Sequence, residues 1–242
     1  MQSLSFVTVC VGKPYIDYFS KVIKSYELLS LPRETKIWIA TNHVEYCKEA
    51  FKESPLSINT IDFSPILDHY KIKEKDYRDN DCIKVRAFIE ALYLDINDFL
   101  FYVDGDMLAH LYNELFDVVF NQEGFYYELC HTYDKEEDIE EHTFKRIRQI
   151  RNLGFEVEFM KNEKGQIIFP IERFWGLKRT CCSKEIKFAE EFNKLFDLLI
   201  SEYRNDLYTE CVEMGHCFSK FFKKNKHINQ GLAFSETNGV TP

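Results

Sequence analysis

The sequence has no apolar run that approaches the roughly 18 residues needed by a membrane-spanning helix. Its amino-terminal residues lack the basic segment and apolar core of a secretion signal. Internal repeats and low-complexity stretches are absent, and 45% of the 242 residues are hydrophobic, as in ordinary globular proteins. We therefore predict a non-secreted, cytoplasmic protein without a transmembrane segment.

An excess of positive charge is also missing. With 31 Lys and Arg against 40 Asp and Glu, the formal net charge of −9 argues against nucleic acid as a partner. The eight cysteines contain no Cys-x-x-Cys pair and fall mostly within apolar patterns. This arrangement predicts reduced, buried thiols rather than disulfides or a zinc site.

The first hundred residues alternate between β-branched apolar runs and segments whose apolar residues have helical spacing. Such alternation is typical of a doubly wound sheet. We predict a single-domain α/β fold with a mostly parallel, Rossmann-like central sheet flanked by helices. The predicted strands are 4–11, 36–41, 58–63 and 99–103, the helices are 14–29, 44–51 and one capped by Asp81, and 64–81 is a loop.

The second half contains a segment of different character, at about 133–167, in which acidic and basic runs follow one another. We interpret it as a solvated, partly helical insertion. Phe144, Ile147 and Ile150 form an apolar stripe on its basic helix, so the alternative is peripheral contact with a membrane surface. Around it we predict helices at 113–120, 186–203 and 211–222, strands at 124–130 and 168–177, and a tail at 235–242.

The apolar strand 99–103 runs directly into Asp104-Gly105-Asp106. In an open α/β sheet, ligands bind outside the carboxyl ends of the strands. Two Asp carboxylates placed there suit a hard divalent cation that also holds phosphates. The alternative is a turn that caps the next helix, for which Asp and Gly are well suited. Metal binding is favoured, because a turn alone does not require a buried strand before it.

This strand, its Asp-x-Asp pair and the following Asn113-Glu-Leu-Phe resemble the GT-A class of nucleotide-sugar glycosyltransferases, especially glycogenin-like and blood-group-type galactosyltransferases. The resemblance implies a GT-A-like fold and an Mn²⁺- or Mg²⁺-dependent enzyme. Its reaction would move a sugar from a UDP- or GDP-sugar to a hydroxyl of a glycan or lipid-linked glycan. Residues 1–110 would bind the nucleotide-sugar and 111–234 the acceptor.

The resemblance also implies roles for charged residues. Asp106 would bind the metal with Asp104 as its partner, and His227 would be a third ligand. The context of His227 departs from the family's His-x-x-Gly, because Gly231 follows one residue later and no Lys-Pro-Trp comes after it.

Lys84 and Arg86 begin the helix before the Asp-x-Asp strand, where related enzymes place residues that touch the donor's phosphates or sugar. They lie on different helix faces. Arg86 has the alternative of pairing with Glu90 four residues on.

The remaining donor contacts are expected from strand ends. The end of the first strand, Thr8 to Gly12, would meet the base and ribose, with Thr41 and Asn42 flanking from the end of the second strand. The contact residues that we name are Thr8, Val9, Cys10 and Thr41. Trp175 precedes a glycine and offers a flat face for a sugar ring, with burial in the core as the alternative.

An acceptor hydroxyl needs a base in an inverting enzyme, and Glu213 is our candidate. Glu210, Glu128 and Glu172 are alternatives, and an ordinary surface glutamate is the alternative for all of them.

Two other functions stay open. One is a non-enzymatic nucleotide- or sugar-binding module. The other is a phosphatase of haloacid-dehalogenase type, although Leu108 stands where that class has Thr. A sugar-phosphate nucleotidyltransferase is disfavoured, because Val11-Gly-Lys-Pro is not the Gly-rich, Arg-containing loop of that class.

Overall fold

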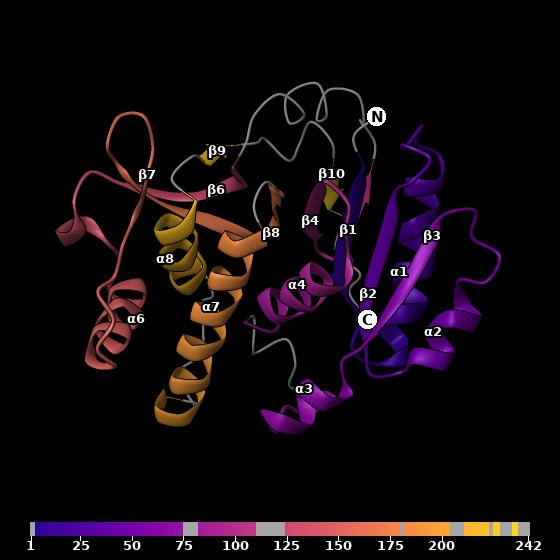
Figure 1. The fold of residues 1–242 in the computed structure, drawn as a ribbon, viewed down its shortest axis with the longest axis horizontal. Helices are drawn as coiled ribbons and strands as arrows, with labels where there is room; N and C mark the ends of the chain where they lie inside the picture. The colour runs from indigo at the N-terminus through magenta and orange to yellow at the C-terminus, as the bar shows by residue number, and fades with distance from the viewer. Residues whose placement is uncertain are drawn as a thin grey trace.

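The computed structural model describes residues 3–74, 82–109, 124–179, 182–203, 211–222, 225–227 and 234–236. Its main sheet is built from β1 (Leu4–Val9), β2 (Lys36–Thr41), β3 (Ser57–Asp62), β4 (Phe99–Val103), β6 (Phe125–Tyr133), β7 (Met160–Lys161), β8 (Ile167–Lys178) and β9 (Asn225–His227). The strand order is β3-β2-β1-β4-β8-β6-β9, with β7 beside β8 (Figure 1). A separate pair joins β5 (Met107–Ala109) to β10 (Phe234–Glu236).

The amino-terminal half winds in two directions from β1. The chain first passes through helices to β2 and β3, and it then returns to place β4 on the other side of β1; all these pairings are parallel. Pro14 lies in the first turn of the first helix, where its missing N–H costs no hydrogen bond. The helices of this half are α1 (Lys13–Glu27), α2 (Val44–Ala50), α3 (Ser64–His69) and α4 (Cys82–Leu94).

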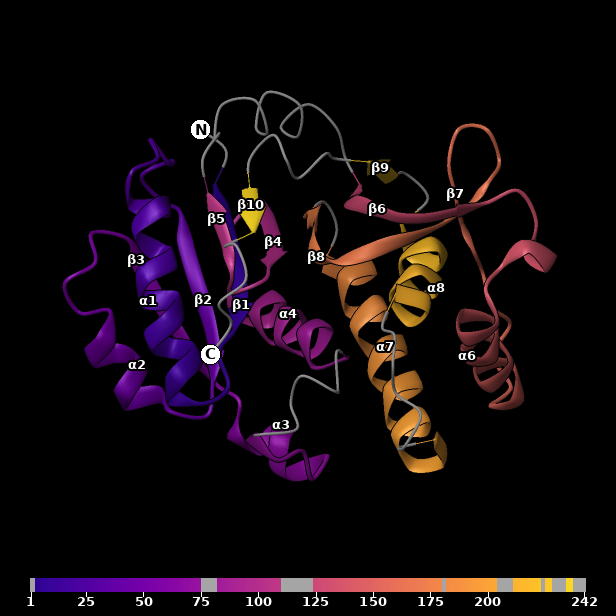
Figure 2. The ribbon, with the colours of Figure 1, turned by 180° about the vertical axis from the view of Figure 1, so that it is seen from behind.

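The carboxyl-terminal half adds an antiparallel strand. β8 runs antiparallel to both β4 and β6, and it continues the sheet away from β1. Figures 1 and 2 show this half beside the first, with its helices next to β6 and β8. Those elements are η2 (Glu136–Asp138), α6 (Glu141–Asn152), α7 (Cys182–Tyr203) and α8 (Cys211–Phe221).

Alternation along the strands produces two cores, one on each face of the sheet. Phe6 and Phe101 belong to the core under α1 and α2. Val7 and Leu100 belong to the other, which α4, α7 and α8 cover. Because both faces of β1 and β4 are covered, these strands are buried throughout their length rather than alternating between buried and exposed residues.

The structure confirms an α/β fold. Its central sheet is mixed, because β8 runs antiparallel to its neighbours, whereas β3-β2-β1-β4 and β6-β9 pair in parallel. Two other expectations are corrected. The predicted loop at 64–81 contains α3 in its described part. The predicted tail begins with β10, which hydrogen-bonds to β5. The predicted helix at 113–120 lies outside the described residues, as does Asp81, the predicted cap of the helix that is α4 in the structure.

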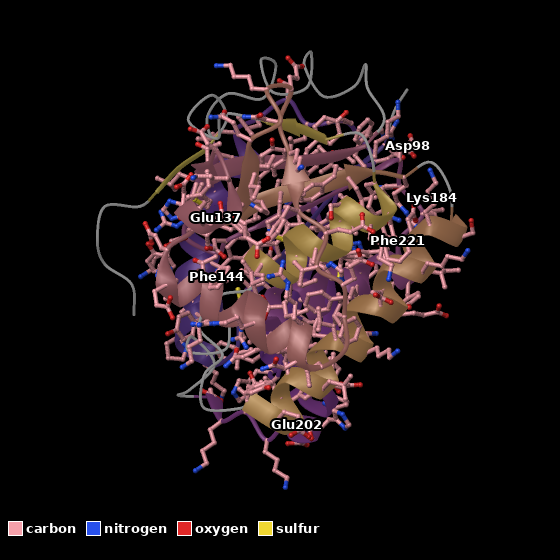
Figure 3. All side chains as sticks on the ribbon, turned by 90° about the vertical axis from the view of Figure 1, so that its left-hand side faces the viewer. Asp98, Glu137, Phe144, Lys184, Glu202 and Phe221 are labelled. Carbon is pink, nitrogen blue, oxygen red and sulfur yellow. The ribbon has the colours of Figure 1, made fainter. Side chains whose placement is uncertain are left out.

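The apolar stripe of α6 is buried and is therefore not a membrane-contacting surface. Ile147 and Ile150 are fully buried within the core that includes α7 and α8, and Phe144 packs against the same core. Figure 3 views this half from outside, with Glu137 and Phe144 on one side and Phe221 of α8 on the other. Within the described ranges, no helix combines the length and apolarity that would carry it across a bilayer.

Gly176 provides a test of the contact between β4 and β8. A Cβ at this position would overlap the Leu100 carbonyl and lie 2.5 Å from Phe101 Cδ1. Backbone cannot yield without breaking the ladder, so we expect Gly176→Ala to lower the free energy of unfolding by about 1–3 kcal/mol. Gly215→Ala is the control, because its Cβ would lie 3.8 Å from Pro170 and alanine favours a helix. Equal melting temperatures for the two variants would contradict this account of the interface.

Candidate functional site

The strand order creates a switch point between β1 and β4. From β1 the chain proceeds to β2 on one side, and it later returns to β4 on the other. The α1 and α4 connections lie on opposite faces of the sheet. In open α/β sheets, ligands bind in the crevice that such a reversal leaves outside the carboxyl ends of the strands. Asp104-Gly105-Asp106 directly follows β4 at this place, and Gly12 follows the end of β1.

Main-chain hydrogen bonds fix the turn that carries the two carboxylates. The Asp104 N–H donates to the Arg173 carbonyl of β8 at 2.9 Å, and the Met107 N–H donates to the Asp104 carbonyl at 3.1 Å. From α1, the Tyr26 hydroxyl donates to the Met107 carbonyl at 3.0 Å. Two other elements, β8 and α1, therefore hold the turn through its main chain, independently of the Asp104 and Asp106 side chains.

Asp104 is an oriented carboxylate. Lys84 Nζ of α4 lies 3.3 Å from each of its two oxygens. The Tyr102 hydroxyl donates to Oδ1 at 2.8 Å. Both charged side chains are only 19% exposed, so water screens their attraction less than it would at an open surface.

The negative charge of Asp106 is less well compensated than that of Asp104. Burial raises the pKa of its carboxyl, and the negative charge of Asp104 raises it further. The positive charges of Arg173 and Lys84 oppose this rise. Burial and both carboxylates likewise raise the pKa of the Tyr26 hydroxyl, so Tyr26 stays a neutral hydrogen-bond donor beside the pair.

Thr8 adds a third oxygen to this place. Its hydroxyl is buried and has no hydrogen-bond partner among the residues that the structure describes. Thr8 Oγ1 lies 3.5 Å from the position that a Cβ on Gly105 would take. A buried hydroxyl without a partner is costly, so its presence beside the turn points to a ligand oxygen, a water or a cation there.

These groups suit a divalent cation that binds together with phosphates. Mg²⁺ and similar hard ions are commonly held by one or two carboxylates, with waters and substrate phosphates completing the coordination. Asp104, Asp106 and Thr8 provide such a partial set. The described ranges hold no cluster of three or more His, Cys, Asp or Glu side chains that would form a complete protein cage.

A cavity of about 430 Å³ opens where β1 gives way to α1. Pro14, Tyr15, Lys73 and Glu74 line it, and its size is within the range of small-molecule pockets. It provides an aromatic ring, a cation and a carboxylate in one place.

Glu74 is held over the end of β1 by polar contacts. Its Oε2 accepts from Asn42 Nδ2 at 2.9 Å and lies 3.3 Å from His43 Nε2. Asn42 Oδ1 in turn accepts the Gly12 N–H at 2.8 Å. Gly12 has φ +95°, and a Cβ there would lie 2.7 Å from Glu74 Oε1. Only glycine satisfies both the backbone conformation and the close approach of this carboxylate.

Of the predicted phosphate contacts, the structure brings only Lys84 to the pair. Arg86 turns toward α7 and donates to Asn193, and its Nη2 lies 3.2 Å from Glu90. Arg86 therefore pairs with Glu90, which was the alternative for this residue, and it also connects α4 to α7.

The predicted strand-end residues lie at the site but mostly face the core. Val9, Cys10 and Thr41 are buried, and Thr41 Oγ1 accepts the His43 N–H at 3.1 Å. Apart from Thr8, these positions offer main chain rather than side chain to a ligand at this edge. Asn42, which follows Thr41, holds the Gly12 loop instead.

Trp175 is a core residue. It is fully buried, with its ring 5.4 Å from that of Tyr102 and 4.5 Å from that of Phe88. Its ring therefore has no face open to a sugar.

The backbone of His227 is distant from the pair. His227 belongs to β9 and pairs with Tyr127 of β6. Because β9 is the third strand after β4 in the sheet, the two strands are about 14 Å apart at a spacing of about 4.8 Å per strand. Its side chain lies outside the described part.

Glu213 is not placed as a base at an open site. It is fully buried, and Arg146 Nε of α6 lies 3.0 Å from its Oε1. Burial raises the pKa of its carboxyl to about 7, although the charge of Arg146 opposes the rise. Glu210 and the side chains of Glu128 and Glu172 lie outside the described part.

Sequence reasoning missed Arg173, Tyr102 and Glu74. A cation directly before the apolar Phe174–Leu177 of a predicted strand was a usable signal for Arg173. No comparable signal existed for Tyr102, because its role depends on ending beside Asp104. Glu74 stood in a polar segment without periodicity.

The fold and the site together define an α/β protein with a carboxylate pair at the switch point of its sheet. No protein-family model matches the sequence, and no curated protein matches it. The function is therefore inferred from the geometry of the site.

Asp106→Asn tests whether this carboxylate serves stability. Ionised Asp106 is disfavoured by burial and by Asp104, so removing its charge should stabilise the protein without metal or nucleotide. We expect the melting temperature with chelator at pH 7.5 to rise by about 1–3 °C, since about 2–4 °C corresponds to 1 kcal/mol at this size. Asp68→Asn, at an exposed site on α3, should change nothing. A fall for Asp106→Asn would show that the carboxylate maintains the turn.

Glu213 should make stability depend on pH. Its pKa is higher in the folded than in the unfolded chain, so the folded state binds more protons between about pH 4.5 and 7, and stability falls as pH rises through that window. We expect a loss of about 1–3 kcal/mol from this group, at about 1.4 kcal/mol per pKa unit. In urea unfolding from pH 5 to 8, the free energy of unfolding should change less steeply with pH for Glu213→Gln than for the wild type. Exposed Glu140→Gln should keep the wild-type slope, and identical slopes for all three would contradict the assignment.

Proposed function

We propose that this protein is a metal-dependent glycosyltransferase with a GT-A-like fold. Its substrates would be a UDP- or GDP-sugar and a hydroxyl of a glycan or lipid-linked glycan. The observation that carries the proposal is the position of Asp104 and Asp106, at the carboxyl end of a buried strand and beside the buried hydroxyl of Thr8. The parallel order β3-β2-β1-β4, with the pair following β4, supports the fold assignment.

The donor would extend from the carboxylate pair to the cavity at the start of α1. A Cβ on Gly105 would lie 3.8 Å from Cys10 Sγ, and Pro14, which lines the cavity, follows Cys10 four residues later in the chain. The end of β1 and the start of α1 would therefore connect the two places. The diphosphate would lie beside Asp104 and Asp106, and the nucleoside would lie in the cavity. There its base could stack on the Tyr15 ring, and its hydroxyl or N–H groups could donate to the Glu74 carboxylate.

The chemistry required of such a site is stabilisation of a departing nucleoside diphosphate. A divalent cation held by Asp106 and Asp104 would supply neutralisation of the charge that develops there. Lys84 adds a fixed positive charge from α4 at the same place. The protein's own contribution is thus to orient the diphosphate and to place positive charge where negative charge grows.

Binding of a nucleoside diphosphate with metal is the direct test. With Mn²⁺ and UDP or GDP at about 100 times the dissociation constant, stabilisation of about 2.7 kcal/mol is expected. This corresponds to a melting-temperature increase of about 5–10 °C for a chain of this size. Asp106→Asn should abolish the increase, and Asp68→Asn should retain it.

The result that would sink the proposal is the absence of any shift with UDP, GDP or the other nucleoside diphosphates in Mn²⁺ or Mg²⁺. Metal-dependent hydrolysis of nucleotide-sugars by the wild-type protein then separates an enzyme from a binding module. A module would bind the nucleotide-sugar and leave it intact.

A further inference from the structure

Arg173 lies directly across the strand ladder from the carboxylate pair. Its carbonyl accepts the Asp104 N–H at 2.9 Å, which fixes the two residues opposite each other. Phe174 belongs to the core under α1, whereas Trp175 and Tyr102 belong to the opposite core. By strand alternation, Arg173 is therefore on the same side of the sheet as Trp175 and Asp104.

The side chain of Arg173 is only partly buried, and its charge acts on Asp106. Lys84 acts on Asp104 from α4, the helix that covers this face of the sheet, and it contacts both oxygens of Asp104. The two carboxylates thus have two cations beside them, from α4 and β8. Their formal charges cancel without any bound ion.

This balance has consequences for ligands. A divalent cation approaching alone meets Lys84 and Arg173, which repel it and compensate part of the negative charge of the carboxylates. A diphosphate approaching alone meets Asp104 and Asp106, which repel it. When both bind, the cation pairs with the carboxylates and leaves the two basic side chains to the phosphates, so opposite charges are neighbours throughout.

We propose that Arg173, together with Lys84, binds the diphosphate of the donor, and that the divalent cation and the diphosphate bind cooperatively because of it. The inference rests on the proposed function and adds to it a phosphate-binding residue and a coupling between two ligands. The planar guanidinium suits this role, because it donates two parallel hydrogen bonds to a phosphate group. The main-chain carbonyl of Arg173 holds the turn, so substitution of the side chain leaves that hydrogen bond in place.

The experiment is calorimetric titration of three proteins: the wild type, Arg173→Gln and the control Arg33→Gln, whose site is exposed. Each is titrated with Mn²⁺ alone, with UDP or GDP alone, and with each nucleotide in the presence of Mn²⁺. The wild type should bind the diphosphate more tightly with Mn²⁺ than without. Arg173→Gln should weaken binding of the diphosphate in Mn²⁺ by about 10- to 100-fold, the range of a hydrogen bond to a charged group. Its affinity for Mn²⁺ alone should stay equal or rise, and Arg33→Gln should match wild type.

Two further comparisons separate phosphate binding from a structural role. Arg173→Gln should reduce the preference for UDP over UMP, or GDP over GMP, and Arg173→Lys should recover part of it because the charge is kept. If Arg173→Gln binds the diphosphate as tightly as the wild type while Asp106→Asn loses binding, the role of Arg173 is overturned and the proposed function stands. Equal weakening of mono- and diphosphate would also overturn it. A wild type that binds no nucleoside diphosphate with metal would remove both proposals.

Discussion

The pairing of β1 with β4 is the constraint on which the rest of the structure depends. Its register sets Phe6 against Phe101 and Val7 against Tyr102, so the two strands end together. The turn after β4 is thereby brought against Thr8 and Cys10. Because β1 also pairs with β2, the same strand separates the two directions of winding and creates the crevice at their carboxyl ends. The location of the site is a consequence of this backbone arrangement.

Charge at that crevice is arranged asymmetrically. Asp104 is paired with Lys84 and hydrogen-bonded by Tyr102, whereas Asp106 lies where burial and its neighbour disfavour ionisation. Like charges held one residue apart at the end of a buried strand cost stability, and natural proteins retain such costs mainly where function requires them. The buried Arg146–Glu213 pair is a contrasting case, since it connects α6 to α8 inside the core.

Much of the fold was predictable because its signals are local. Apolar β-branched runs gave the positions of β1, β2 and β4, and Pro14 marked the start of α1. The antiparallel direction of β8 was not predictable, because nothing in Ile167–Lys178 specifies which strand it will join. Trp175 shows the same limit within the site. Its aromatic type suited a sugar or a core equally, and only its position over Tyr102 decided for the core.

The sequence by itself determined that two carboxylates follow a buried strand, since strand pattern and motif are contiguous in the chain. It also determined the α/β class. Only the tertiary structure decided the partners of those carboxylates, because Lys84, Thr8 and Arg173 come from three segments that meet through strand register and helix packing. The same packing directed Arg86 to α7 and Glu213 to Arg146. The sequence shows the chemical type of each side chain, whereas the neighbours of that side chain are defined only by the folded structure.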